Sequence, residues 1–288
     1  MSTATKTLKL PFLRLNRTKA DEFARLQTLN TATANVILAM PKDERRTLTS
    51  KSFAHIEIGS GNEGNRLNGG YAQFVVAEAG NVIHKPHDLT FVDASGLALA
   101  PITGVRAVIV GKVGKGDRML ITGVSGAVGS AAAVAAKARG VYVIGTASAR
   151  HADFLRVIGV DEVIDYTKVK FEEQVHDVDA VLDTVGGDNL ERAMTTLKKG
   201  GRILTTARGD IAAVCRPDVV CIPRGPAHGQ PRSTVDEVAS LVDSGKLRAK
   251  VSKTFPLAEA GQAQQYGEKG GADGKVVLIM DEARANSK

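Results

Sequence analysis

From Asp117 onward, short apolar runs alternate with longer stretches that carry one apolar face. Apolar runs of about five residues are typical of buried strands, and the stretches between them have the spacing of helices. This alternation predicts an α/β fold, with a parallel sheet covered by helices on both faces. The expected strands are 118–122, 141–146, 161–165, 179–183, 201–206 and 275–280, and the expected helices are 127–139, 149–158, 168–175, 188–198 and 234–244.

The first part of the chain has a different pattern. Apolar residues at three- and four-residue steps predict one amphipathic helix over 18–40, which Pro41 would end. The stretch 59–70 is rich in Gly and Asn and predicts a linker or a long loop. Two short strands are expected after it, at 71–77 and 81–86.

A glycine-rich turn lies between the expected strand 118–122 and the helix that follows it. Such a turn lets backbone N–H groups face a diphosphate at the helix N-terminus. Gly123 is expected to take a positive φ, Gly126 to leave room for the phosphates, and Gly129 to let helix and strand pack closely. The turn therefore predicts a dinucleotide site.

The end of the next strand bears on which coenzyme is bound. An acid there would bind the ribose hydroxyls of NAD, but the chain has Ser148 and Arg150 and no acid. Hydroxyl and guanidinium groups donate to a phosphate, which favours NADP over NAD. The alternative is that Arg150 is a solvated residue opening the next helix.

Composition excludes few classes of protein. The 288 residues carry a net charge of +7, and residues 1–60 hold ten Lys or Arg against five Asp or Glu. A local basic excess serves nucleic-acid binding or is a solvated face. No apolar run reaches about 18 residues and the first residues lack a signal-peptide core, so we expect a cytoplasmic protein. Cys215 and Cys221 are too few for a disulfide scaffold or a four-cysteine zinc site, and we expect reduced thiols.

The stretches GGYAQFVV (69–76), LITGVSGAVGSAA (120–132), VDAVLDTVGG (178–187) and GKVVLIM (274–280) follow one another in this order. From about Gly69 the chain resembles the zinc-independent quinone oxidoreductase branch of the medium-chain dehydrogenase/reductase superfamily. The resemblance implies a Rossmann domain that holds NADPH and a GroES-like barrel domain that covers the nicotinamide. It also implies homodimers joined through sheet edges, and it implies no metal.

The resemblance assigns roles to residues by position. It implies that Ser125, Gly126, Ala127 and Val128 contact the pyrophosphate and that Ser148 and Arg150 contact the 2′-phosphate. It also implies that Tyr166 borders the adenosine phosphate and that Val185 and Gly186 contact the nicotinamide ribose. The alternative for the DTVGG stretch is a turn that caps the fourth strand. No catalytic residue is assigned.

The chain departs from the family in several places. Fewer residues precede Gly69 than the family has there, so the barrel is expected to be truncated. The family's PLAGLTA turn is present as Pro101–Ala107, in which Arg106 replaces a threonine near the nicotinamide. Arg106 is a candidate for polarising a substrate carbonyl by position only, and His84 is expected to be a surface residue.

Residues 1–60 resemble the N-terminus of OrfB-type accessory proteins of insertion-sequence transposons, on the stretches KTLKLPFLRLNRTKADEFARLQTLNTATAN and LTSKSFAHIEIGS. This predicts a fusion in which an unrelated helical segment, 1–60, precedes a reductase. The expected parts are a partial GroES-like domain over 61–105, completed by 246–288, and a Rossmann domain over 106–245.

The expected activity is NADPH-dependent hydride transfer to a quinone, an enone or a related activated carbonyl compound. One alternative is a catalytically impaired NADP-binding remnant of such an enzyme. Another is nucleic-acid binding through residues 1–60.

Overall fold

The computed structural model describes residues 34–36, 52–54, 82–86, 89–97, 99–207, 210–223, 232–269, 272 and 274–279. The predictions made for most of 1–60, for the linker 59–70 and for the strand 71–77 lie outside these residues.

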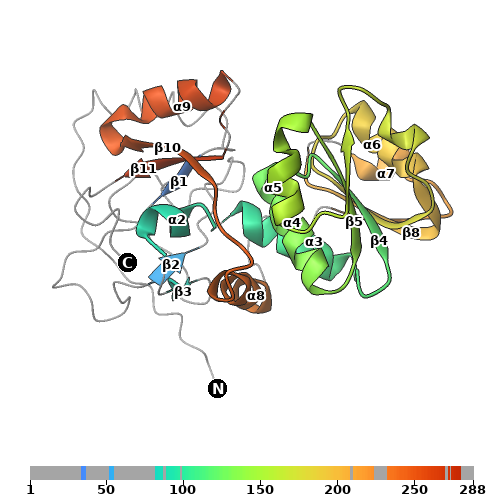
Figure 1. The fold of residues 1–288 in the computed structure, drawn as a ribbon, viewed down its shortest axis with the longest axis horizontal. Coiled ribbons are helices and arrows are strands. Elements are labelled where there is room, and N and C mark those ends of the chain that lie inside the picture. Colours follow the sequence, from blue (N-terminus) through green and yellow to red (C-terminus); the bar gives the residue numbers. More distant parts are fainter. Residues whose placement is uncertain are drawn as a thin grey trace, which may run out of the picture.

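A six-stranded parallel sheet forms the larger part of the fold (Figure 1). Its order is β6-β5-β4-β7-β8-β9. The chain runs from the centre to one edge and then returns to fill the other side, which is the doubly wound arrangement. In such sheets, ligands bind at the carboxyl ends of the strands where the order reverses, which are β4 and β7 here. The strands are β4 Arg118–Thr122, β5 Tyr142–Ala147, β6 Glu162–Asp165, β7 Val178–Asp183, β8 Leu197–Thr205 and β9 Val220–Ile222.

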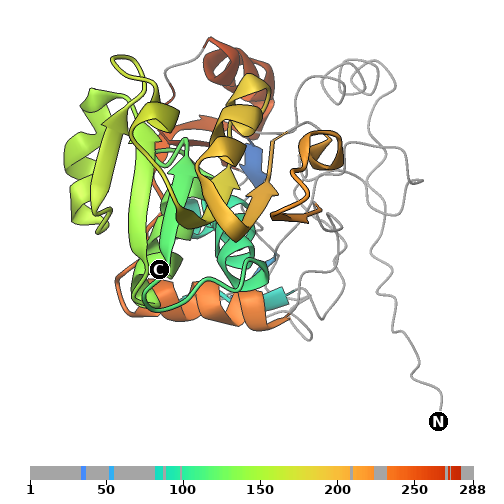
Figure 2. The same cartoon turned by 90° about the vertical axis from the view of Figure 1, so that its right-hand side faces the viewer.

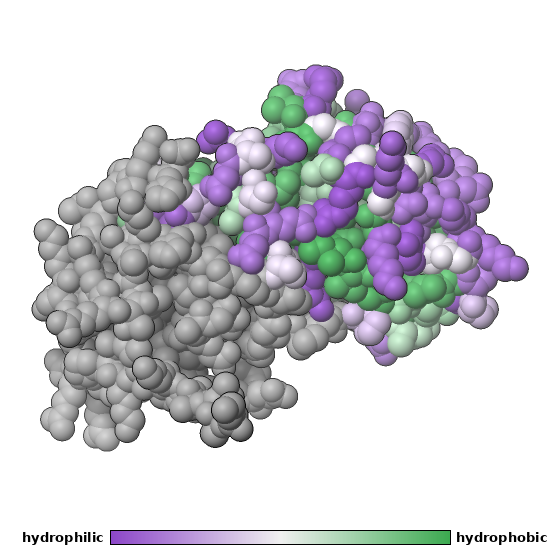
Figure 3. Space-filling view, turned by 90° about the horizontal axis from the view of Figure 1, so that it is seen from below, coloured by the Kyte–Doolittle hydropathy of each residue, from purple (hydrophilic) through white to green (hydrophobic). Residues whose placement is uncertain are grey.

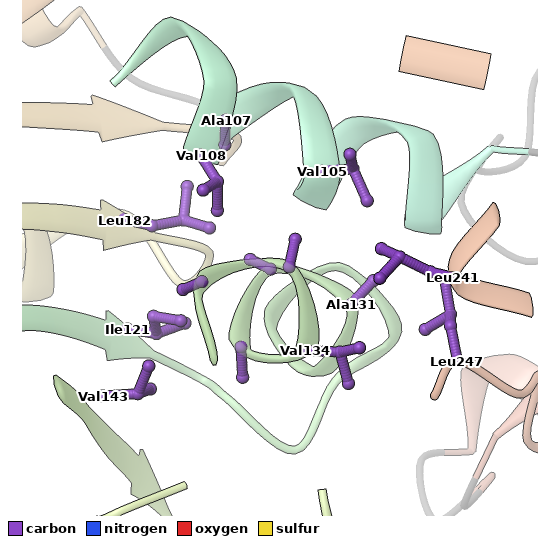
Figure 4. Packing of buried hydrophobic residues seen from close by; sticks show 14 of the residues in the cluster. Val105, Ala107, Val108, Ile121, Ala131, Val134, Val143, Leu182, Leu241 and Leu247 are labelled. Atoms are coloured by element: carbon purple, nitrogen blue, oxygen red, sulfur yellow. The ribbon is translucent and has the colours of Figure 1, made fainter. Parts of the chain in front are cut away.

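Helices cover both faces of this sheet, as the sequence predicts. Against one face pack α3 (Ala100–Val110), α4 (Ala127–Ala138) and α5 (Ala152–Val157), and α8 (Arg232–Asp243) packs on α3. Ile121 and Leu182 point from the strands toward α4 in this core, and Ala131 of α4 lies beside Leu241 of α8 (Figure 4). Against the other face packs α6 (Asp188–Thr195), through Leu190 and Met194. The short α7 (Ile211–Val214) lies on the same side.

A smaller group of strands lies beside this sheet. The strands β10 (Val251–Pro256) and β11 (Lys275–Ile279) are parallel, and β1 (Ala34–Val36) pairs with the other edge of β11. One face packs on α9 (Ala260–Glu268), and Val277 on the other face contacts α2 (Phe91–Ser95). In Figure 2, α9 and α8 lie at opposite ends of the view. A separate antiparallel pair joins β2 (Ser52–Ala54) to β3 (Val82–His84).

Three expectations about local structure are wrong. The helix over 18–40 fails at Ala34–Val36, which form a strand because they pair with Val276–Leu278 at the far end of the chain. The helix over 168–175 is reduced to a 3₁₀ turn at Phe171–Glu173, since one turn suffices to bury both Phe171 and Val175. Residues 101–107 are helical rather than a turn, because Pro101 is tolerated in the first helical turn of α3.

The expectation of two reduced thiols is also wrong. Cys215 and Cys221 form a disulfide, with their Cα atoms 6.0 Å apart. Cys215 directly follows α7 and Cys221 lies in β9. The turn between them is held by the ion pair of Arg216 and Asp218, at 2.6 Å. This turn brings the two cysteines to the separation that a disulfide requires.

The face of the larger sheet region that is seen from below carries both hydrophilic and apolar residues (Figure 3). The view from below shows a larger apolar area and smaller apolar spots among hydrophilic residues (Figure 3). Among the described residues, the exposed large apolar side chains are Ile109, Tyr142, Val157, Tyr166, Val169, Val185 and Val220. Tyr166 and Val185 follow the carboxyl ends of strands, and Val220 lies in the edge strand β9.

Candidate functional site

The glycine turn links β4 to α4 with the backbone that its sequence predicts. Gly123 has φ 67°, and a Cβ there would lie 2.6 Å from Thr184 Oγ1. A Cβ on Gly129 would lie 2.6 Å from the carbonyl oxygen of Gly123. The predicted positive φ at Gly123 and the predicted close packing at Gly129 are therefore confirmed.

The N-terminus of α4 offers unpaired donors beside this turn. Gly126 is the N-cap residue, and no side chain caps the helix. The first N–H groups of a helix have no partner within it, and they carry the positive end of its dipole. Gly126 is exposed, and Ser125, Ala127 and Val128 are half-buried. This end of α4 can therefore bind an anion through main-chain donors.

A buried carboxylate lies next to the turn. Asp183, the last residue of β7, has no exposed surface. It accepts hydrogen bonds from Thr122 Oγ1 at 2.7 Å and from Thr205 Oγ1 at 2.8 Å, at the ends of the flanking strands β4 and β8. It also accepts one from Asn189 Nδ2 at 2.8 Å. The carboxylate thus joins three strand ends and α6.

The DTVGG stretch is a tight turn between β7 and α6. The N–H groups of Val185 and Gly186 donate to Asp183, at 3.2 Å and 3.0 Å. Gly186 and Gly187 have φ of 77° and 59°, a region that favours glycine. Val185 is 57% exposed. The stretch therefore does cap β7, and it also places an apolar side chain at the carboxyl edge of the sheet.

A third group of residues lies where β5 and β6 end. Ala147 and Asp165 are paired across these strands, so Ser148 and Tyr166, the residues that follow them, leave the sheet side by side. Ser148 is half-buried and Tyr166 is 58% exposed. Arg150 is exposed, and its Nε donates to His151 Nε2 at 3.1 Å.

Asp165 carries a negative charge at the same corner. Its carboxylate accepts from the hydroxyl and the N–H of Thr167, at 2.7 Å and 3.0 Å. These bonds, with smaller contributions from Lys168 and the N–H of Ala149, lower the pKa of Asp165. The carboxylate is thus held by neighbours of its own.

Helix α3 crosses the first turn of α4 closely. A Cβ on Gly104 would lie 2.3 Å from the carbonyl oxygen of Val128. Arg106, half a turn further on, is half-buried and has no hydrogen bond or ion pair with another described residue. No hydrogen bond or ion pair therefore connects Arg106 with the glycine turn or with the turn after β7. His84 lies in β3, and its side chain is outside the described part.

Sequence reasoning missed the hydrogen-bonded group around Asp183. Its members Thr122, Thr205 and Asn189 received no role, although Thr122 and Asp183 each end an expected strand. A polar residue closing an apolar run was the signal that could have found them.

Metal-ligand clusters and membrane-spanning helices are both absent from the described residues. In that part of the chain, no group of three or more His, Cys, Asp or Glu side chains could hold a metal ion. Within the same residues, every helix is too short or too polar to cross a membrane.

Comparisons with known proteins assign the family. Residues 158–278 match the family model described as zinc-binding dehydrogenase. The fold matches the structure of the quinone oxidoreductase from Coxiella burnetii with a TM-score of 0.68 and 30% identity, over 78% of this chain and 76% of that one. The chain belongs to the medium-chain dehydrogenase/reductase superfamily. The crystal structure of the CurK enoyl reductase is also similar, with a TM-score of 0.63, 26% identity and coverage of 71% of this chain and 68% of that one.

Several of the curated relatives are oxidoreductases by name. The mouse NAD(P)H oxidoreductase RTN4IP1, mitochondrial, is 33% identical over 243 residues, which are 73% of this chain and 61% of the relative. The pig quinone oxidoreductase is 26% identical over 74% of this chain and 70% of its own length. The chain therefore spans about three-fifths of the RTN4IP1 relatives it matches.

Proposed function

We propose that the protein is an NADPH-dependent oxidoreductase that transfers hydride to a quinone, an enone or a related activated carbonyl compound. The observation that carries the proposal is the open N-terminus of α4 beside the glycine turn, one strand away from the Asp183 turn. The names of the relatives support the reaction class, among them the NADPH-dependent alkenal/one oxidoreductase of Arabidopsis thaliana, 28% identical over 75% of this chain and 54% of its own length. The bound coenzyme supplies the hydride, and the protein supplies binding and orientation.

The diphosphate would lie on the main-chain donors of the α4 terminus. The residues there fit such a group, because a Cβ on Gly126 would meet only the carbonyl oxygen of Gly123, at 3.3 Å. The face of the turn is therefore open, and the helix dipole favours a negative charge there. Ser125, Gly126, Ala127 and Val128 are the proposed contacts.

The adenosine end would lie at the corner after β5 and β6. No acid ends β5, and the exposed guanidinium of Arg150 with the hydroxyl of Ser148 suits a 2′-phosphate. Tyr166 would border the adenosine phosphate. Val185 and Gly186 would contact the nicotinamide ribose.

A catalytically impaired remnant is the second candidate. The observation that favours it is that Arg106, the candidate for polarising a substrate carbonyl, has no hydrogen bond or ion pair with another described residue. Hydride transfer requires close alignment of coenzyme and acceptor, and a misplacement of about 1 Å can cost about 100-fold in rate. A protein that binds NADPH and does not oxidise it with any quinone or enone would be this remnant.

Four further expectations belong to the same proposal. The GroES-like assignment of 61–105 with 246–288, beside the Rossmann domain 106–245, follows the family. So do chemistry without zinc and a homodimer formed through edge strands, for which β9 offers Val220, 52% exposed. A cytoplasmic location is a prediction of the sequence, whereas the name of the mouse relative contains the word mitochondrial.

Residues 1–60 are proposed to derive from a transposon protein. Their basic excess makes nucleic-acid binding the third candidate function. Such binding would weaken steeply between low and moderate salt, since phosphate contacts release counterions. Binding that is insensitive to salt would eliminate this candidate.

The test of the coenzyme assignment is a fluorescence titration with NADPH and NADH. Arg150→Ala should lose NADPH affinity selectively, by roughly tenfold for a lost charged hydrogen bond, and should keep its NADH affinity. Arg156→Ala is the matched control, because Arg156 is also exposed in this segment but pairs with Asp153. Absence of binding of either coenzyme by the unaltered protein would refute the proposed function. Equal losses for NADPH and NADH in Arg150→Ala would refute the 2′-phosphate contact alone.

A further inference from the structure

The Asp183 carboxylate accepts hydrogen bonds from N–H groups of the turn that follows β7. Val185 and Gly186 both donate to it, and Thr122, Thr205 and Asn189 hold it from three other elements. A buried carboxylate with this many donors is fully compensated and fixed in place. The turn therefore has one defined orientation before any ligand binds.

This orientation decides which groups the turn offers outward. No peptide bond in the described chain is cis. In a trans peptide the C=O of one residue points opposite to the N–H of the next. Since the N–H groups of Val185 and Gly186 point toward Asp183, the carbonyl oxygens of Thr184 and Val185 point away from it. No described residue donates to these two oxygens.

The two turns at this edge of the sheet thus differ in chemistry. The glycine turn and the start of α4 present N–H donors, which suit phosphate oxygens. The turn after β7 presents carbonyl acceptors and the exposed side chain of Val185, which suit hydroxyl or amide N–H groups attached to an apolar ring. A coenzyme with a diphosphate at one turn would place its nicotinamide riboside, which carries hydroxyls and a carboxamide, at the other.

We propose that Asp183 is a positioning residue, which fixes the turn at 184–187 so that its carbonyl oxygens and Val185 receive the nicotinamide half of the coenzyme. This inference rests on the proposed function, since it takes the bound molecule to be a nicotinamide dinucleotide. Asp183 itself would touch no part of that molecule, because it is completely buried.

The variant Asp183→Asn tests whether the hydrogen bonds accepted by Asp183 position the turn. One carboxylate oxygen accepts from Thr122 and Val185, and the other accepts from Gly186 and Thr205. An asparagine side chain has one accepting oxygen and one donating amino group. One side of the turn therefore loses its acceptor, and an N–H group of the turn faces another donor.

The control is Asp179→Asn at the opposite end of the same strand. Asp179 accepts from the N–H of Arg118 at 2.8 Å and pairs with Lys198. It therefore also holds neighbouring strands together, but it lies away from the carboxyl edge. A second variant, Asn189→Ala, removes one donor to Asp183 and keeps the carboxylate.

The experiment measures the affinity of each protein for NADPH and for 2′,5′-ADP, which lacks the nicotinamide half, together with the unfolding curve. Asp183→Asn should bind NADPH about tenfold more weakly, as expected for about 1.4 kcal/mol, and should bind 2′,5′-ADP as the unaltered protein does. Asn189→Ala should show the same selectivity to a smaller degree, and Asp179→Asn should change neither affinity.

Each outcome decides between the two claims. Equal losses for both ligands in Asp183→Asn, or unchanged NADPH affinity, would overturn the positioning role while leaving the proposed function intact. If Asp183→Asn does not fold, Asn189→Ala decides by the same comparison. Failure of the unaltered protein to bind NADPH and 2′,5′-ADP would refute the proposed function, and the positioning role would fall with it.

Discussion

The contact of Gly129 with the glycine turn predicts the effect of one added methyl group. A Cβ on Gly129 would lie 2.6 Å from the carbonyl oxygen of Gly123 and 2.7 Å from Cα of Val124. Both are backbone atoms, so relief requires α4 to move away from the turn. Overpacking of this kind costs about 1–3 kcal/mol. Alanine in place of glycine within a helix is favourable by about 0.5–1 kcal/mol, so Gly129→Ala should destabilise the protein by about 1 kcal/mol, within a range of about 0–2.5 kcal/mol.

The matched control is Gly261→Ala in α9. No atom lies within 4 Å of a Cβ built there, so only the helical gain of about 0.5–1 kcal/mol should remain. Urea unfolding followed by circular dichroism measures both changes, and an NADPH titration measures the effect on the site. Gly129→Ala should weaken NADPH binding because the donors of α4 move, and Gly261→Ala should not. Equal stability and equal affinity in Gly129→Ala and the unaltered protein would refute this account of the turn.

Two further predictions concern stability. Reduction of the Cys215–Cys221 disulfide, whose cysteines are six residues apart, should destabilise the protein by about 2 kcal/mol in the chain-entropy picture. Thermal unfolding with and without dithiothreitol measures this, and a Cys215→Ser, Cys221→Ser double variant that still responds to dithiothreitol would contradict it. The hydrogen bonds from Arg192, at 2.7 Å, lower the pKa of Glu172 below its ordinary value of 4.5. A lowered pKa in the folded state contributes stability above the unfolded value, and this contribution is lost as pH falls through the folded value. Glu172→Gln should therefore be less stable at neutral pH and approach the unaltered protein below about pH 4 in urea unfolding, whereas a constant difference across pH would contradict the assignment.

Features fixed by local sequence were predictable. The strand Arg118–Thr122 has the predicted bounds, and Gly123 has the predicted positive φ, because both depend on residues close in the sequence. The family was predictable for the same reason, since its motifs are short and follow one another in order. The superfamily assignment was confirmed by the comparisons.

Features that depend on distant pairing were not predictable. Asp183 and Thr205 come together with Thr122 only because β4 and β8 flank β7 in the sheet, and the sequence does not reveal the strand order by itself. The strand at Ala34–Val36 obeys the same rule, because its partner lies more than two hundred residues further along the chain. Its local pattern favoured a helix, and the distant partner overrode it.

The position of β11 between β1 and β10 has a consequence for biosynthesis. All six strands of the larger sheet lie within residues 118–222, so that sheet can assemble while the ribosome is still translating the rest. The smaller sheet can assemble only after its central strand β11, Lys275–Ile279, has been translated. A nascent chain stalled before residue 275 would leave β1 and β10 as two unpaired edges, open to association with other chains.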